Sequence, residues 1–428
     1  MIGVATAWLS GLVLIGLPVA AVLVLLALIL AGTYSFFPLL PALGEVLWSS
    51  STEFVLVAVP LFILMGELLL RAGIARDMYD GLETWTGRIP GGLMHTNIAA
   101  SALFSATSGS SVATAATIGT VALPHMRRHA YNAPLYLGSV AAGGTLGILI
   151  PPSINLILYG VLAETSIPQL YLAGLVPGLM LAALFSLTIL VVCSVRTGMS
   201  GPARRATWAE RVRGLRGIVP PFGLFLVVVG SIYAGIATPT EAASLGVLAA
   251  LGLAALRKRL DGAMLMAALE STMRTTAMVM LIVLAAFFLN FVMVAVGLTG
   301  ALTDAMRGLD LPPVTVMLII IAIYLVLGCF METLSLMVAT TPIVVPVVVA
   351  LGYDTVWFGV LFMLLIEAAL ITPPIGVNLF VVQSVRGGGP IRDVMVGALP
   401  FLVAMIVMML LLLAFPGLAL WLPGWAAG

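Results

Sequence analysis

The chain has 428 residues, of which 62% are hydrophobic and only 8% are charged. Because a soluble domain is about 25% charged, this composition excludes a soluble globular protein. The net charge of +1 gives no indication of a nucleic-acid partner. Both cysteines, Cys193 and Cys329, lie inside apolar runs, which argues against a disulfide framework or a thiolate metal site. We therefore expect an all-α polytopic membrane protein.

The first apolar segment has no basic region before it, so we interpret it as a retained membrane helix and not as a cleaved signal peptide. Further apolar runs follow, each roughly 20 residues or longer, which is enough to cross the hydrocarbon core as a helix. The predicted crossings cover residues 8–30, 54–70, 132–163, 169–195, 218–236, 240–256, 275–298, 355–385 and 396–422. Two more apolar stretches, 93–124 and 312–352, remain to be placed.

The distribution of Lys and Arg places these two stretches. The linkers at 31–53, 164–168, 237–241 and 299–311 contain acidic residues but only one basic residue, Arg307. If the two stretches are hairpins that enter and leave on the same side, every other Lys and Arg falls on one face. The positive-inside rule assigns that face to the cytoplasm. The charge pattern therefore predicts two re-entrant hairpins.

The two halves of the sequence resemble each other. The segments "GILIPPSINL" (147–156) and "ALITPPIGVNL" (369–379) both carry a Pro-Pro pair, and the pairs are 222 residues apart. The same spacing separates Pro90 from Pro312, each at the start of an unplaced stretch. One odd crossing between the halves inverts the second copy, and inverted repeats with broken helices are a recurring plan of secondary transporters.

This organisation divides the chain into two inverted repeats, each with a re-entrant helical hairpin and a broken helix. The first repeat covers 1–196, with its hairpin near 93–124. The second covers 240–428, with its hairpin near 312–352. Between them we expect a cytoplasmic amphipathic linker at 197–217, which is rich in arginine, and an extra connecting span at 218–239.

The first hairpin carries a dense run of small hydroxyl residues, "SATSGSS" (105–111). Such a run suits close packing of membrane helices, but it also suits a hairpin tip whose non-helical backbone lines a watery cavity. A tip supplies hydroxyl and carbonyl oxygens, which hard cations prefer. Opposite it, Pro151 and Pro152 remove backbone donors and so free carbonyl groups one turn earlier. The candidate carbonyl ligands are those of Thr145, Gly147 and Ile150. Half-helix N-termini could in turn hold a carboxylate.

The second half repeats this scheme in "LGCFMETLSLMVATTPIVVP" (327–346) and "ITPPIGVN" (371–378). Glu332 stands out, because an acidic residue at membrane depth is costly and usually functional. An equally weighted alternative is a carboxylate that water reaches at the external mouth. Glu67 and Glu367 also lie within predicted spans, and we assign them no role beyond helix packing or gating.

Motifs of soluble enzyme chemistry are missing from the sequence. It contains no P-loop, no zinc-protease helix and no nucleophile elbow. The "SATSG" run lacks the spacing of a serine intramembrane protease, and no histidine is well placed to act as its base. We therefore expect a protein that is not an enzyme and that needs no cofactor.

Several stretches resemble the large membrane subunit of the tripartite ATP-independent periplasmic (TRAP) transporters, the DctM family. They are "SGSSVATAATIG" (108–119), "GGTLGILIPPSI" (143–154), "YLAGLVPGLM" (171–180), "ATPTEAASLG" (237–246), "LITPPIGVNLF" (370–380) and the closing "ALPFLVAMIVMMLLLLAFPGLALWLP". The resemblance covers essentially the whole chain. It implies a sodium-driven transporter of the bacterial inner membrane with elevator-type scaffold and transport domains. It also implies a small four-helix DctQ-type subunit and a periplasmic DctP-type protein that delivers an organic anion.

The resemblance also implies where ligands bind. Sodium as coupling ion is expected at Ser105, Ser108, Gly109, Ser110, Thr145, Gly147, Ile150 and Ser153 in the first half, and at Gly328, Thr333, Thr372, Pro374 and Gly376 in the second. The substrate is expected at Ser111, Pro152, Asn155, Glu332 and Asn378. Glu332 stands where the family usually has an acidic residue, often aspartate.

The function that we predict is sodium-coupled import of a carboxylate-containing organic anion, in contact with membrane lipid and with no nucleic acid. The nearest alternative is a stand-alone ion-coupled transporter of the wider ion-transporter group, which takes its substrate directly from solution. A membrane-embedded hydrolase and a passive channel are more distant alternatives. Dependence of uptake on a soluble binding protein separates the first two.

Overall fold

The structure, a computed structural model, describes residues 1–128, 131–196, 198–201, 206–307 and 311–427. All regular elements in these ranges are helices, as the composition predicts. Seven of the described helices are long and apolar enough to cross a membrane. They are α4 with the short helix before it, α10, α11, α12, α13, α16 and α19. The Arg307 side chain lies outside the described part, as do residues 197 and 202–205 of the predicted linker.

The helices of the first half are α1 (Ile2–Leu14), α2 (Val19–Tyr34), α3 (Leu43–Ser51), α4 (Ala58–Arg71), α5 (Ile74–Thr86), α6 (Leu93–Ser108), α7 (Ser111–Arg128), α8 (Ala133–Thr145), α9 (Ile154–Leu162) and α10 (Ile167–Val195), with 3-10 turns at Leu40–Ala42 and Phe54–Val57. Those that follow are α11 (Trp208–Tyr233), α12 (Pro239–Leu256), α13 (Gly262–Ala295), α14 (Leu298–Arg307), α15 (Pro313–Leu327), α16 (Thr333–Ala350), α17 (Thr355–Ile371), α18 (Val377–Arg386), α19 (Ile391–Ala414) and α20 (Gly417–Ala427).

The predicted single crossing at 8–30 is wrong, because two shorter helices, α1 and α2, occupy this segment and pack against each other. Gly16 adopts a left-handed conformation with φ of 80°, and Pro18 occupies the N-cap position of α2. A left-handed glycine ends a helix and a proline cannot continue one, so the chain turns here. The signal, "GLP", was present in the sequence.

Both stretches that we could not place as simple crossings are interrupted. The first breaks between α6 and α7 at Gly109 and Ser110, inside the hydroxyl-rich run. The second breaks between α15 and α16. The second arms of the two hairpins, α7 and α16, begin 222 residues apart, at Ser111 and Thr333. The predicted helix breaks are confirmed, whereas re-entry from one side of the membrane stays a prediction.

The two predicted broken helices are also present. The first consists of α8 and α9, joined by the non-helical segment 146–153. The second consists of α17 and α18, joined by 372–376. Each joint contains a cis peptide bond within its Pro-Pro pair. The secondary structure therefore repeats at the spacing that the sequence shows, while the inverted orientation of the copies and an elevator movement stay predictions.

Residues 208–217 do not form a separate amphipathic helix. They are the first turns of α11, which continues through the connecting span to Tyr233. Thr207 and Glu210 cap its start reciprocally, with the Thr207 N–H donating to Glu210 Oε2 at 2.7 Å. Likewise, α13 is one helix of 34 residues that begins at Gly262, well before the predicted crossing at 275–298.

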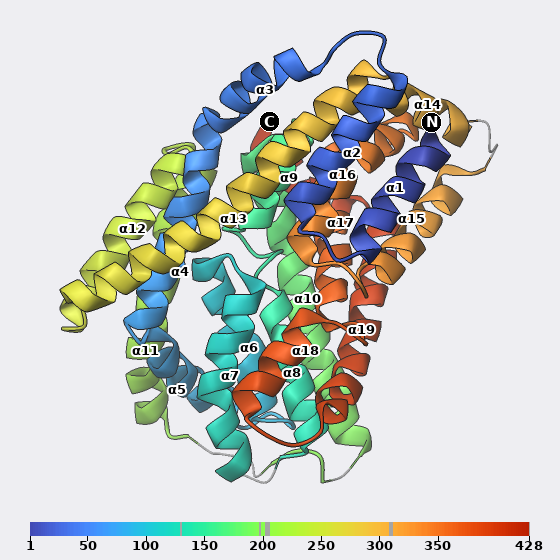
Figure 1. The fold of residues 1–428 in the computed structure, drawn as a ribbon. Coiled ribbons are helices and arrows are strands. Elements are labelled where there is room, and N and C mark those ends of the chain that lie inside the picture. Colours follow the sequence, from blue (N-terminus) through green and yellow to red (C-terminus); the bar gives the residue numbers. More distant parts are fainter. Residues whose placement is uncertain (129–130, 197, 202–205, 308–310, 428) are drawn as a thin grey trace.

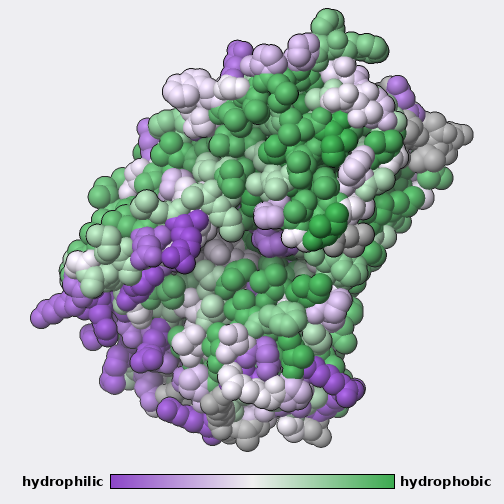
Figure 2. Space-filling model, viewed as in Figure 1, coloured by the Kyte–Doolittle hydropathy of each residue, from purple (hydrophilic) through white to green (hydrophobic). Residues whose placement is uncertain are grey.

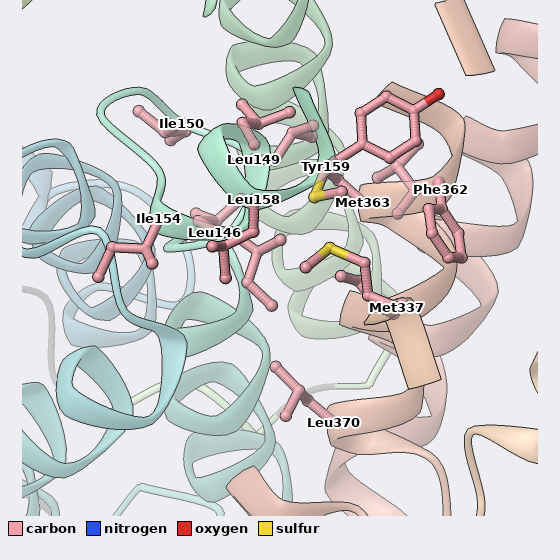
Figure 3. Packing of buried hydrophobic residues seen from close by; sticks show 14 of the residues in the cluster. Leu146, Leu149, Ile150, Ile154, Leu158, Tyr159, Met337, Phe362, Met363 and Leu370 are labelled. Atoms are coloured by element: carbon pink, nitrogen blue, oxygen red, sulfur yellow. The ribbon is translucent and has the colours of Figure 1, made fainter. Parts of the chain in front are cut away.

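Figure 1 shows α4, α5, α11 and α12 grouped on one side, with α13 running diagonally across the molecule. The interrupted helices occupy the centre. Side chains of both halves meet there in one hydrophobic core, in which the interrupted segment and α9 pack beside Met337 and Met363 (Figure 3). Tyr159 of α9 joins the halves further, since its hydroxyl donates to the Thr355 carbonyl at 2.8 Å. The core thus fixes the breaks of the first half relative to the second.

Candidate functional site

The hairpin breaks and the first interrupted helix surround a cavity of about 400 Å³ near the middle of the molecule, which we name the central cavity. The face drawn in Figure 2 is hollowed near its centre. The central cavity has walls from both halves and from α4 and α13. Its lining includes Ile63, Gly66, Glu67, Phe104, Ser108, Gly109, Ser110, Ser111, Asn155, Thr275, Met278, Glu332, Thr333 and Leu370. Seven of the predicted site residues are therefore brought together.

The first hairpin tip is built around Gly109. This residue ends α6 in a left-handed conformation with φ of 61°, which glycine adopts without steric cost. The hydroxyl groups behind the tip form a buried chain: Ser108 Oγ lies 3.1 Å from Thr114 Oγ1, and Thr114 Oγ1 donates to the Ser110 carbonyl at 2.8 Å. Ser105 is fully buried and reaches Thr114 at 3.5 Å. The tip is therefore ordered by its own hydroxyls.

The tip lies directly against the interrupted helix. Ser111 Oγ donates to the Thr145 carbonyl at 2.9 Å. A Cβ on Gly147 would lie 2.8 Å from the backbone of Ser110, and a Cβ on Gly109 would lie 2.8 Å from the Pro152 carbonyl oxygen. Real Cβ atoms do not come this close to backbone atoms, so only glycine allows the two segments to touch.

Free carbonyl groups are present beside this contact. The Thr145 carbonyl already accepts bonds from Ser111 Oγ and from the Ile148 N–H. By contrast, none of the described groups donates to the carbonyls of Gly147 and Ile150. Ser153 is buried, and its hydroxyl caps α9 by accepting from the Leu156 N–H at 3.4 Å. Hydroxyl and carbonyl oxygens suit a hard alkali cation better than a transition metal.

Glu332 has a structural partner set. Its carboxylate caps α16 by accepting from the N–H and the hydroxyl of Ser335, both at 3.1 Å, and Thr333 Oγ1 donates to its other oxygen at 3.0 Å. An acidic residue at this position also interacts favourably with the positive end of the helix. Because Glu332 lines the central cavity as well, the cap brings a negative charge to its wall.

The other predicted residues of the second half lie apart from the cavity. Gly328 packs against Ala369 of α17. Pro374 is exposed, and Thr372 donates to the Ala368 carbonyl of its own helix. Asn378 is fully buried, and its amide donates to the Ala141 carbonyl of α8 at 3.2 Å. Gly376 lies beside Leu370. The structure therefore assembles the first predicted sodium site more closely than the second.

Sequence reasoning missed the wall that α4 and α13 contribute. Glu67 lines the cavity, pairs with Arg71 at 3.2 Å and accepts from Ser271 Oγ of α13 at 2.8 Å. Thr275 lies one helical turn beyond Ser271 and also lines the cavity. In the sequence, the only indication of this wall was Glu67, an acidic residue within an apolar run. Its position does not show which helix lies opposite.

Glu367 is the most deeply buried carboxylate of the described chain. It is fully inaccessible, and neither oxygen makes a hydrogen bond with a described group, although the amides of Leu149 and Ile148 face it. It therefore sits between α17 and the interrupted segment, behind the cavity wall. Among the described residues, no group of three His, Cys, Asp or Glu side chains could hold a metal ion.

We expect Ser111→Ala to lower the free energy of unfolding by about 1 kcal/mol, because it removes the bond that joins the hairpin tip to the Thr145 carbonyl. Thermal unfolding of the detergent-solubilised protein measures the change. Ser194→Ala is a matched control, since Ser194 is exposed and bonds only within its own helix. Equal stability of the two variants would contradict the expectation.

Comparison with known proteins shows extensive similarity. A family model described as "Tripartite ATP-independent periplasmic transporter, DctM component" matches residues 6–418. The sialic acid TRAP transporter large permease protein SiaM of Vibrio cholerae is 34% identical, and the alignment covers 99% of this chain and 98% of that protein. The C4-dicarboxylate TRAP transporter large permease protein DctM of Pseudomonas aeruginosa is also 34% identical, with 89% and 88% covered. The ectoine TRAP transporter large permease protein TeaC of Halomonas elongata is 30% identical, with 99% of each chain covered.

Solved structures share the fold at low sequence identity. The YdaH transporter of Alcanivorax borkumensis superposes with a TM-score of 0.61 at 16% identity, covering 93% of this chain and 97% of the other. MtrF of Neisseria gonorrhoeae gives a TM-score of 0.62 at 12% identity, covering 92% and 94%. These likenesses concern the architecture alone.

Proposed function

Since the chain belongs to the DctM family, the large permease subunits of TRAP transporters, we propose that it imports a carboxylate-containing organic anion and couples this import to sodium. Membership of the family makes the protein a multi-pass membrane permease. The relatives are named as permeases and not as enzymes. The coupling ion, the kind of substrate and the sites are our proposal.

One observation carries the anion: three helix N-termini line the central cavity. They are the first turns of α7 at Ser111, of α9 at Ile154 and of α16 at Thr333. The N-terminus of a helix carries a partial positive charge, so it favours a carboxylate. At α16 the Glu332 carboxylate already takes this place, so the starts of α7 and α9 are the ones that we propose for the transported anion. Asn155, at the start of α9, adds a side-chain amide to the cavity wall. A carboxylate can therefore be held there without a dedicated lysine or arginine.

The sodium ion would bind beside this anion site. We propose four oxygen ligands for it: the carbonyls of Gly147 and Ile150 and the hydroxyls of Ser110 and Ser153. One sodium ion that moves inward through a potential of 100 mV supplies about 2.3 kcal/mol, before any contribution from its concentration gradient. Sodium bound at this contact would hold the hairpin tip and the interrupted helix together. Because both also line the anion site, the sodium gradient would then drive capture of the anion.

We further propose that the protein lies in a bacterial inner membrane, with its basic face toward the cytoplasm, as the positive-inside rule implies. A small four-helix membrane subunit and a periplasmic binding protein would complete the transporter. The tripartite description of the matching family supports a transporter of three components, one of them periplasmic.

The experiment that tests this function is uptake into proteoliposomes that contain both membrane subunits. We expect accumulation of succinate, N-acetylneuraminate or ectoine only with an inward sodium gradient and with the cognate binding protein outside. Equal uptake without the binding protein would favour the stand-alone transporter. Downhill equilibration without accumulation would indicate a channel.

The sodium site has its own test. We expect Ser110→Ala and Ser153→Ala each to raise the sodium concentration for half-maximal uptake about tenfold, because one oxygen contact to a charged group contributes about 1.5 kcal/mol. Ser49→Ala, at an exposed serine on α3, serves as control. An unchanged sodium titration in both variants would contradict the assignment of these two hydroxyls.

A further inference from the structure

A second and larger cavity opens beside the central one, which we name the basic vestibule. Its volume is about 1110 Å³, and it lies between the second arm of the first hairpin, the α4–α5 turn and the end of α12. In Figure 2 hydrophilic residues gather on the lower left of the molecule, over the region where α5, α11 and the free ends of α12 and α13 lie in Figure 1. From the sequence, the arginines of this region are predicted only to lie on the basic face.

The basic vestibule carries a strong excess of positive charge. Four arginines and one aspartate line it. Arg257 is neutralised by Asp77 at 2.7 Å, and Arg71 pairs with Glu67. Arg76 and Arg259 make no ion pair within 4 Å with any described residue, although Asp80, one turn further along α5, attracts Arg76. Their guanidinium groups can therefore still bind an anion. Guanidinium groups bind carboxylates and phosphates well because they present two parallel donors.

An unsatisfied hydroxyl also faces this space. Thr117 lines the basic vestibule from α7 and is 6% exposed, and its Oγ1 has no hydrogen-bond partner among the described groups. Buried polar atoms are normally bonded, and an exception calls for an explanation such as a bound ligand or water. A small anion between Thr117 and the arginines would supply the missing partner.

The basic vestibule adjoins the central cavity. Leu70 of α4 and Ala113 and Ala116 of α7 line both spaces. The side chains of α7 that lie between the two spaces are therefore small alanines. An anion that leaves the central cavity toward the basic side would therefore pass Arg76 and Arg259.

We propose that the basic vestibule is a second, transient binding site for the transported anion, in which Arg76, Arg259 and Thr117 hold its carboxylate on the way out of the central cavity. The proposal rests on the proposed function. The arginines are exposed and wetted, so their attraction is screened and their hold on the anion is weak. A weak site in the basic vestibule, next to the tighter site in the central cavity, lets the anion leave toward the basic face without being trapped.

The charge of the basic vestibule can be measured without transport. Thr120 lies on its exposed wall, so a Thr120→Cys variant with Cys193 and Cys329 replaced by alanine carries one reactive thiol there. The probes are an anionic sulfonate and a cationic trimethylammonium methanethiosulfonate, applied to protein in phosphatidylcholine nanodiscs. We expect Arg76→Gln with Arg259→Gln to lower the ratio of sulfonate to ammonium labelling rates about fivefold, since two nearby unit charges are lost in a screened aqueous space.

Two exposed arginines outside the basic vestibule supply the matched control, Arg196→Gln with Arg392→Gln, for which the ratio should stay within twofold. The anion that the wild type accumulates in proteoliposomes should slow labelling of the Thr120→Cys variant by the sulfonate reagent. In the uptake experiment, the double variant Arg76→Gln with Arg259→Gln should take up this anion several-fold more slowly. An unchanged labelling ratio, or unchanged uptake, would overturn the proposal.

The same measurement separates the transported anion from a lipid headgroup, which offers similar chemistry. Protection that appears only in phosphatidylglycerol nanodiscs, and not with the transported anion, would assign the site to lipid and overturn the proposal. If the wild type accumulates none of succinate, N-acetylneuraminate and ectoine, the proposed function fails and the release role fails with it. The labelling ratio would still report whether the basic vestibule attracts anions.

Discussion

Replacing Gly147 with alanine is expected to reduce sodium-driven uptake about tenfold to a hundredfold. The new Cβ would lie 2.8 Å from the Ser110 carbonyl carbon and from the Ser111 nitrogen. Both atoms belong to the backbone, so no flexible side chain can move aside. Overpacking of this kind costs about 1–3 kcal/mol, which corresponds to roughly this loss of occupancy. The hairpin tip must move away from the segment whose free carbonyls we assign to sodium.

Uptake into proteoliposomes at saturating and at limiting sodium measures this effect, because a displaced tip should weaken the response to sodium most. Gly388→Ala is the matched control, since a Cβ there meets no atom within 4 Å. Size-exclusion chromatography should show that both variants remain folded. If Gly147→Ala keeps uptake within twofold of the wild type, the close approach of tip and segment is not needed for transport.

The second large effect concerns stability. Gly397→Ala should lower the free energy of unfolding by about 3 kcal/mol, the upper end of the range for overpacking. Gly397 of α19 and Gly138 of α8 bring their helices into backbone contact, and a Cβ on Gly397 would overlap the Pro134 carbonyl. Small residues at helix interfaces allow such approach in membranes, where packing drives association. Because α8 positions the interrupted segment, the variant should lose uptake as well.

The fraction of protein that stays monodisperse after heating in detergent reports this loss. Gly252→Ala is a suitable control, because Gly252 lies within α12 and a Cβ there meets nothing within 4 Å. Alanine is the better helix former, so this variant should be as stable as the wild type or slightly more stable. Equal unfolding temperatures for the two variants would show that α8 and α19 can separate without cost.

Local chemistry explains where the helix breaks were predicted correctly. Gly109 can adopt a left-handed conformation, and the Pro-Pro pairs at 151–152 and 373–374 cannot continue a helix. The incorrect prediction at 8–30 also concerns such residues. We predicted one crossing there from the high mean hydropathy, although Gly16 and Pro18 of the "GLP" segment indicate a helix break. Hydropathy averages over a window, whereas a break needs only one or two residues.

Predictions about single polar residues were less complete. Glu332 could be singled out as an acid at membrane depth, yet its role as the cap of α16 depends on the local turn at Ser335. Glu67 and Thr275 lie on helices far apart in the sequence, and only the packing of α4 against α13 directs both into the central cavity. Asn378 was expected at the substrate, but its amide bonds with α8.

The sequence by itself determined the class of protein, the family, and the breaks at the first hairpin tip and at the two Pro-Pro pairs. Composition is a simple sum over the chain, and glycines and prolines act on the backbone locally. Only the tertiary structure decided which oxygens, arginines and helix N-termini face a common space. The physical reason is that convergence depends on the rotation and contact of helices that are distant in the sequence, such as α7, α9 and α16. The glycines that permit such contacts are visible in the sequence, but the backbone atoms that they must accommodate are not.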